Sequence, residues 1–87
     1  MRQPWQYVLT AHAERDMERL SEAIRRRVFA ALDRVSAEQA GNTQKLHGMG
    51  DEYRLRVGDW RVRFRFDTPA RTIVVLQVLP RGRAYRR

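Results

Sequence analysis

The clearest pattern of hydrophobic and polar positions lies between Tyr53 and Phe66. Apolar residues and arginines alternate there on both sides of Gly58 and Asp59. Period-two alternation is typical of a strand with one buried and one exposed face. A Gly-Asp pair between two such runs predicts a two-residue hairpin turn, in which a leading glycine favours the type II′ form.

The predicted hairpin pairs its residues outward from the turn. The expected pairs are Val57 with Trp60, Arg56 with Arg61, Leu55 with Val62, and Arg54 with Arg63. Directly opposed residues share a face, so one face, called here the arginine face, carries Arg54, Arg56, Arg61, Arg63 and Arg65. Like charges opposite each other cost ~0.2–1 kcal/mol per pair. A bound phosphate relieves this repulsion, whereas a merely solvated sheet face is the alternative interpretation.

The remaining pattern predicts an α+β fold. We expect a short strand at 3–9, helices at 11–20 and about 22–39, a connection at 43–52, and a strand at 72–79. The last strand is apolar on both faces apart from Gln77, which is typical of an interior strand. The order β-α-α-β-β-β indicates a helical hairpin packed on one face of a mostly antiparallel four-stranded sheet. The position of the first strand in that sheet stays open.

Composition supports a single small domain over residues 1–87, with a basic tail at 81–87. The chain has no cysteine, no long apolar run and no secretory signal, so we expect a cytoplasmic protein without membrane contact. Its net charge of +8 is concentrated in residues 51–87, which hold ten arginines and four acidic residues. Nucleic acid is the first partner class to expect, and an acidic protein is the second.

Four segments carry a further pattern: KLHG at 45–48, YRLRVGDWRV at 53–62, IVVL at 73–76 and PRGRAYR at 80–86. Together they resemble the RelE/ParE superfamily of toxin–antitoxin toxins. The resemblance implies that a cognate antitoxin binds and neutralises the protein. RelE-like members cut messenger RNA in the ribosomal A site, whereas ParE-like members share the fold and poison DNA gyrase.

The resemblance also implies site residues. The catalytic positions of RelE-like members correspond to Arg54, Arg56, Arg61, Arg81 and Tyr85. The RNA-binding positions are expected at Lys45, Arg63, Arg65, Arg83 and Arg86. Guanidinium groups suit the negative charge of the phosphorane that forms when a ribose 2′-hydroxyl attacks the phosphate. Arginine keeps its proton, so a base role does not carry over to Arg54 or Arg56. Tyr85 could act as the base only if neighbouring arginines lowered its pKa substantially from about 10, and the identity of the base and acid stays open.

Other polar residues receive structural interpretations. His12 is expected at the surface and His47 as structural or solvent-exposed. Asp51 and Glu52 are expected as charge partners of Arg54 or Arg56. No histidine or carboxylate residues have ligand spacing, so we expect neither a metal nor a cofactor. The RelE-like nuclease, with messenger RNA and the ribosome as partners, is preferred. A ParE-like gyrase poison without nuclease activity and a plain nucleic-acid-binding module are the alternatives.

Overall fold

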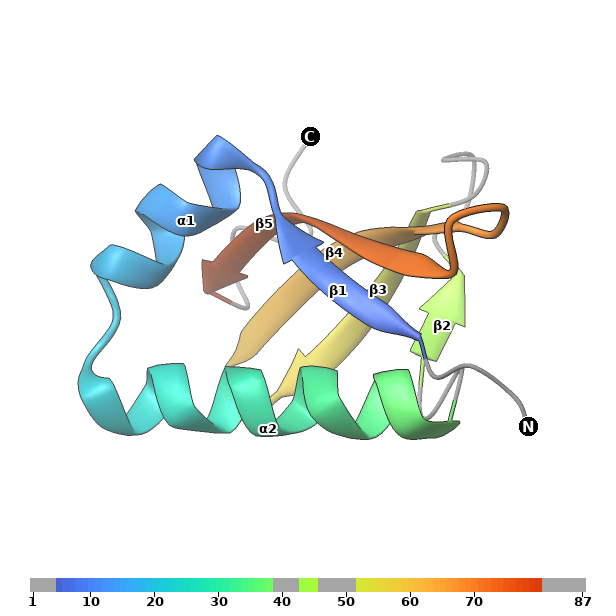
Figure 1. The fold of residues 1–87 in the computed structure, drawn as a ribbon. Coiled ribbons are helices and arrows are strands. Elements are labelled where there is room, and N and C mark those ends of the chain that lie inside the picture. Colours follow the sequence, from blue (N-terminus) through green and yellow to red (C-terminus); the bar gives the residue numbers. More distant parts are fainter. Residues whose placement is uncertain (1–4, 39–42, 46–51, 81–87) are drawn as a thin grey trace.

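The computed structural model describes residues 5–38, 43–45 and 52–80. Within them the helices are α1 (Ala11–Glu18) and α2 (Glu22–Glu38), and the strands are β1 (Gln6–Leu9), β2 (Thr43–Lys45), β3 (Glu52–Val57), β4 (Trp60–Asp67) and β5 (Thr72–Pro80). The strands form one sheet in the order β1-β5-β4-β3-β2 (Figure 1). β1 runs parallel to β5, and the other neighbours are antiparallel. The predicted α+β fold with a mostly antiparallel sheet is confirmed.

The sheet contains one strand more than the four predicted. The sequence pattern predicts a connection at 43–52, but Thr43–Lys45 pairs antiparallel with β3. The segment is short, polar and without alternation, so its own residues do not indicate a strand. Its strand conformation comes from hydrogen bonding to the neighbouring β3, a tertiary contact that local propensity does not report.

The β3–β4 hairpin has the predicted register. Val57 faces Trp60, Arg56 faces Arg61, and the pairing continues to Glu52 opposite Arg65. Gly58 has a φ of +57°, and Asp59 is not among the described residues with positive φ. A positive φ at the first central position only is the requirement of the type II′ turn.

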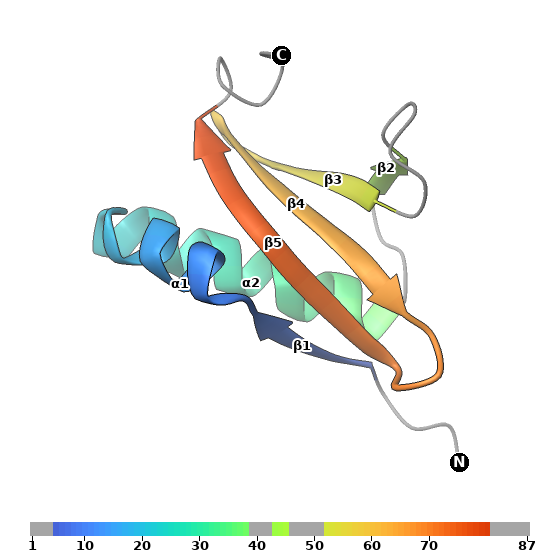
Figure 2. The same cartoon turned by 90° about the horizontal axis from the view of Figure 1, so that it is seen from above.

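The hydrophobic core lies between the sheet and α2. Figures 1 and 2 show α2 along one face of the sheet and α1 beside β5, beyond the end of β1. The core from the helices consists of Ala13, Met17, Leu20, Val28, Ala31, Leu32 and Val35; the sheet contributes Leu55, Val57, Val62, Phe64, Ile73, Val75 and Val78. The apolar stripes predicted for both helices are therefore buried, and they leave the arginine face on the side of the sheet away from α2.

Helix α1 takes the place of a strand along the second half of β5. Thr10, the N-cap of α1, donates from its backbone N to Val75 O at 3.0 Å and from Oγ1 to Leu76 O at 3.2 Å. Asp16 Oδ2 accepts a hydrogen bond from Val78 N at 2.9 Å. These contacts satisfy backbone groups of β5 where β1 no longer pairs with it.

A bulge in β5 changes which side of the sheet its second half presents. Arg63 pairs with Gln77 but the next residue, Phe64, pairs with Val75, so Leu76 is the extra residue. Strict alternation from Val75 would place Gln77 on the same side, toward α2. The bulge instead places Gln77 opposite Arg63 on the arginine face.

Candidate nucleic-acid interface

The arginine face is built by β3 and β4, whose alternating apolar residues bury the opposite side against α2. Its guanidinium groups differ in exposure: Arg56 and Arg65 are exposed, Arg54 and Arg63 are half-buried, and Arg61 is only 4% exposed. The common face predicted from the sequence is therefore present in the sheet register. The most accessible charge lies at Arg56, near the turn, and at Arg65, farther along β4.

Arg61 is turned toward the hairpin turn. Its Nη1 donates to Trp60 O at 3.1 Å and to Gly58 O at 3.5 Å. These bonds place a buried cation against the carbonyl groups of the turn, directly opposite Arg56 in the register. The described contacts of Arg61 stabilise the hairpin turn. A direct contact of Arg61 with a phosphate stays a prediction.

Arg63 lies between two acceptors from the neighbouring strands. Its Nη2 is 2.6 Å from Glu52 Oε1 on β3, and its Nη1 donates to Gln77 Oε1 on β5. The side chains of Arg63 and Glu52 are only 24% and 22% exposed. Glu52 is thus a charge partner within the arginine face, but the ion pair described is with Arg63 and not with the predicted Arg54 or Arg56. Its negative charge offsets the repulsion between Arg63 and the opposed Arg54.

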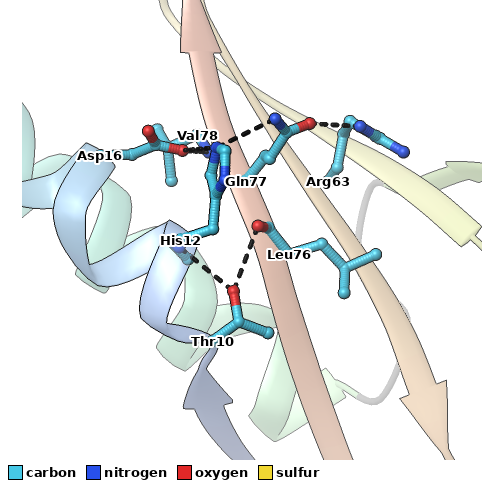
Figure 3. A network of polar contacts seen from close by, with 8 residues as sticks. Thr10, His12, Asp16, Arg63, Leu76, Gln77 and Val78 are labelled. Carbon is cyan, nitrogen blue, oxygen red and sulfur yellow. Dashed lines mark hydrogen bonds and ion pairs between the residues drawn. The ribbon is translucent and has the colours of Figure 1, made fainter.

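The polar network continues from Gln77 to helix α1. Gln77 Nε2 lies 3.1 Å from His12 Nε2, and His12 Nε2 lies 3.6 Å from Asp16 Oδ2 (Figure 3). Since Gln77 Oε1 accepts from Arg63, its amide hydrogens are directed at His12. In the tautomer that carries its proton on Nδ1, His12 Nε2 is the acceptor of this contact.

Sequence reasoning missed this position of His12, which it expected at the surface without a role. The side chain is 53% exposed, yet it reaches the β5 margin of the arginine face. Two signals were available: the four-residue spacing of His12 and Asp16 on one helix, and Gln77 as a single polar residue in an apolar strand. Neither signal indicates by itself that the two segments meet.

Several predicted site residues lie outside the described part of the chain. These are Arg81, Arg83, Tyr85 and Arg86; His47 and Asp51 lie outside it as well. The backbone of Lys45 pairs with Tyr53, but the described features do not include its side chain. The roles of these residues stay predictions.

The described residues, 5–38, 43–45 and 52–80, were considered for a metal site and for a membrane-spanning helix. No group of three or more His, Asp or Glu side chains lies close enough there to hold a metal ion. No helix in these ranges is long and apolar enough to cross a membrane. The described chemistry of the face thus consists of guanidinium groups with one carboxylate, one carboxamide and one imidazole. Such a set can bind phosphates and can move one proton.

Comparison with known protein families gives a match over most of the chain. A family model for the ParE toxin of the type II toxin–antitoxin system parDE matches residues 7–85. A search of curated protein sequences gave no match.

Solved structures of toxin–antitoxin complexes are similar to the chain. A chain of the RelBE2 complex from Mycobacterium tuberculosis has a TM-score of 0.80 and 28% identity, covering 90% of this chain and 99% of that one. A chain of the archaeal RelE–RelB complex from Pyrococcus horikoshii has a TM-score of 0.78 and 28% identity, covering 93% and 99%. The intact Escherichia coli RelBE complex, with a TM-score of 0.76 and 20% identity over 87% and 95%, shares the fold.

Proposed function

Because the chain belongs to the ParE toxin family of type II toxin–antitoxin systems, we propose that this toxin acts as a metal-independent endoribonuclease on messenger RNA in the ribosome. The observation that carries the proposal is the arginine face, whose residues alternate along β3 and β4 with apolar residues that are buried against the helices. The likeness to RelE-containing complexes at 28% identity supports it. In such a reaction the ribose 2′-hydroxyl attacks the adjacent phosphate.

The arginine side chains are proposed to have different roles, because they differ in exposure. Arg54 and Arg56 bind the equatorial oxygens of the phosphorane, where each well-placed donor is worth about 10²–10³ in rate. Arg61 holds the turn that carries Arg56, and Arg65 positions the RNA strand. Arg81 and Tyr85 are proposed as further catalytic residues. Lys45, Arg83 and Arg86 are proposed to add contacts to the RNA. The ribosome supplies the alignment of the attacking oxygen, since positioning alone contributes several kcal/mol.

The proposal also names the partners. A cognate antitoxin is expected to neutralise the toxin, because the similar solved structures are toxin–antitoxin complexes. The excess of positive charge in residues 51–87 suits an antitoxin segment with acidic residues. The site of action is the cytoplasm, where ribosomes and messages are.

A second candidate function is poisoning of DNA gyrase, without nuclease activity. The matching family is named for ParE, which favours this candidate, whereas the similar solved structures carry RelE names. The two functions differ in what accumulates in cells that express the toxin. A nuclease generates new messenger 5′ ends, and a gyrase poison generates trapped gyrase–DNA complexes.

The test expresses the protein and maps 5′ ends of translated messages. Cuts in phase with codons are expected, and Arg56→Ala should reduce them by about 10²-fold or more because it removes a phosphate donor. Arg34→Ala is the matched control, since Arg34 is an exposed arginine of α2 on the other side of the molecule. Intact messages together with trapped gyrase–DNA complexes would overturn the nuclease and support the second candidate.

A further inference from the structure

The reaction proposed above requires a proton acceptor. The sequence pointed to Tyr85, which lies outside the described residues, whereas the structure brings a different group, the imidazole of His12, to the arginine face. We propose that His12 is a catalytic residue, which accepts the proton of the attacking 2′-hydroxyl while Asp16 stabilises the resulting imidazolium. This inference rests on the proposed nuclease function and assigns its general base. The observation that carries it is the contact between His12 Nε2 and Gln77 Nε2 at the edge of the arginine face.

The arginine face itself offers no suitable base among its described residues. Arginine does not release its proton under ordinary conditions. Glu52 is engaged with Arg63 at 2.6 Å and is mostly covered. His12 differs from both, because imidazole changes its charge between about pH 5 and 8, where general bases work best.

The geometry gives His12 a lone pair directed at the face. Gln77 lies opposite Arg63 in the register, so the imidazole of His12, which contacts Gln77 from α1, reaches the same side of the sheet as the arginines. The imidazole accepts from Gln77 at Nε2, and its side chain is 53% exposed. A ribose hydroxyl can replace the Gln77 amide hydrogen as the donor to Nε2, an exchange of one hydrogen bond for another.

The charges around His12 favour this proton transfer. Asp16 Oδ2, on the same helix, lies 3.6 Å from Nε2 and is held in place by Val78 N at 2.9 Å. Strand β5, which packs against α1, carries no titratable side chain from Thr72 to Pro80. Arg63 on β4 is separated from His12 by Gln77 and is paired with Glu52. After the transfer, the new proton on His12 Nε2 therefore lies beside the Asp16 carboxylate, which stabilises the imidazolium.

The step is balanced in atoms and charge. The 2′-oxygen forms a bond to phosphorus as its proton moves to His12 Nε2. The bond from phosphorus to the 5′-oxygen breaks, and that oxygen takes a proton from solvent. The products are a 2′,3′-cyclic phosphate and a 5′-hydroxyl, and His12 returns its proton to water.

The test measures single-turnover cleavage of a short message in the A site of purified ribosomes. His12→Gln keeps an acceptor for Gln77 but has no basic nitrogen, so cleavage should be slowed by about 10²–10⁴-fold. Binding to the programmed ribosome should be unchanged. Glu14→Gln, on the exposed side of the same helix, is the matched control and should cleave like the unaltered protein.

Two further readouts separate a base from a structural residue. The rate of the unaltered protein should rise with pH between about 5 and 8, and His12→Gln should lose this rise. Asp16→Asn keeps an acceptor for Val78 N but removes the charge beside the imidazole, so cleavage should be slowed while binding to the programmed ribosome is kept. Added imidazole should restore part of the activity of His12→Ala, whose circular dichroism and antitoxin binding serve as folding checks.

The outcomes distinguish the inference from the function on which it rests. If the unaltered protein cleaves and His12→Gln cleaves equally fast with the same pH profile, His12 is not the base and the nuclease function stands. If the folded, unaltered protein cleaves no message on the ribosome, both proposals are overturned.

Discussion

At the scale of single residues, the arginine face contains charges with different surroundings. Arg61 is buried against the carbonyls of the turn, and Arg63 is held between Glu52 and Gln77, whereas Arg56 and Arg65 are exposed. Among the residues that the structure describes, the Glu52 carboxylate compensates part of the repulsion that the alternating arginines create. The face combines stabilised positive charge with accessible positive charge.

Glu52 is the residue whose loss should disturb this balance most directly. Glu52→Gln keeps the shape but removes the charge next to Arg63, so we expect a loss of about 1–3 kcal/mol in the free energy of unfolding, typical of hydrogen bonds to charged groups. Urea denaturation measures it. Glu18→Gln, an exposed acidic residue of α1, is the control and should have little effect. Equal stability of the two variants would show that the Glu52–Arg63 pair contributes nothing.

At the scale of elements, the β3–β4 hairpin combines two locally encoded features. The alternation selects which side chains are buried, and the two-residue turn sets the register. Gly58 adopts a φ of +57°, which other residues rarely accept. A Cβ atom there would lie 2.9 Å from Arg27 Nη2, the end of a flexible and exposed side chain that can shift.

The turn should therefore respond to substitution through its backbone. Gly58→Ala should reduce the free energy of unfolding by about 1–2 kcal/mol, the penalty of a side chain at positive φ. Gly58→Asn should lose less, because asparagine tolerates this conformation better. Thermal or urea denaturation of both variants measures the difference. If Gly58→Ala were as stable as the unaltered protein, the turn would not require its glycine.

At the scale of the whole molecule, the sheet and helix layers are joined by polar as well as apolar contacts. Burial raises the pKa of Tyr7 on β1 above 10.0, and a hydrogen bond to Asp33 on α2 together with the negative charge of Asp33 raises it further. The neutral phenol is therefore the form that the folded protein favours. A raised pKa contributes stability that is complete below the unfolded value and is lost as pH rises through the folded value.

The raised pKa of Tyr7 predicts that the free energy of unfolding decreases at alkaline pH. The urea midpoint of the unaltered protein should fall as pH rises above about 10, where Tyr7 loses its proton in the unfolded chain before it does so in the folded protein. Tyr7→Phe should be less stable near neutral pH, since it lacks the hydrogen bond, but should fall less steeply over the same range. Parallel pH profiles for the two proteins would contradict a role for Tyr7.

The sequence by itself determined the features that depend on neighbours along the chain. The arginine hairpin, its turn and the apolar stripe of α2 follow from local periodicity, because contacts within a hairpin or a helix join residues close in sequence. The family resemblance and the α+β class follow from the same segments. The site positions Arg54, Arg56 and Arg65 were correctly placed on one face for this reason.

Only the tertiary structure decided the contacts that join distant segments. It placed β1 parallel to β5, added β2 to the sheet, and brought His12 to Gln77 across 65 residues of sequence. The bulge at Leu76 turned Gln77 from the core side to the arginine face. No local pattern reports such events, because bulges and edge contacts depend on how separate elements pack and on which backbone groups need partners.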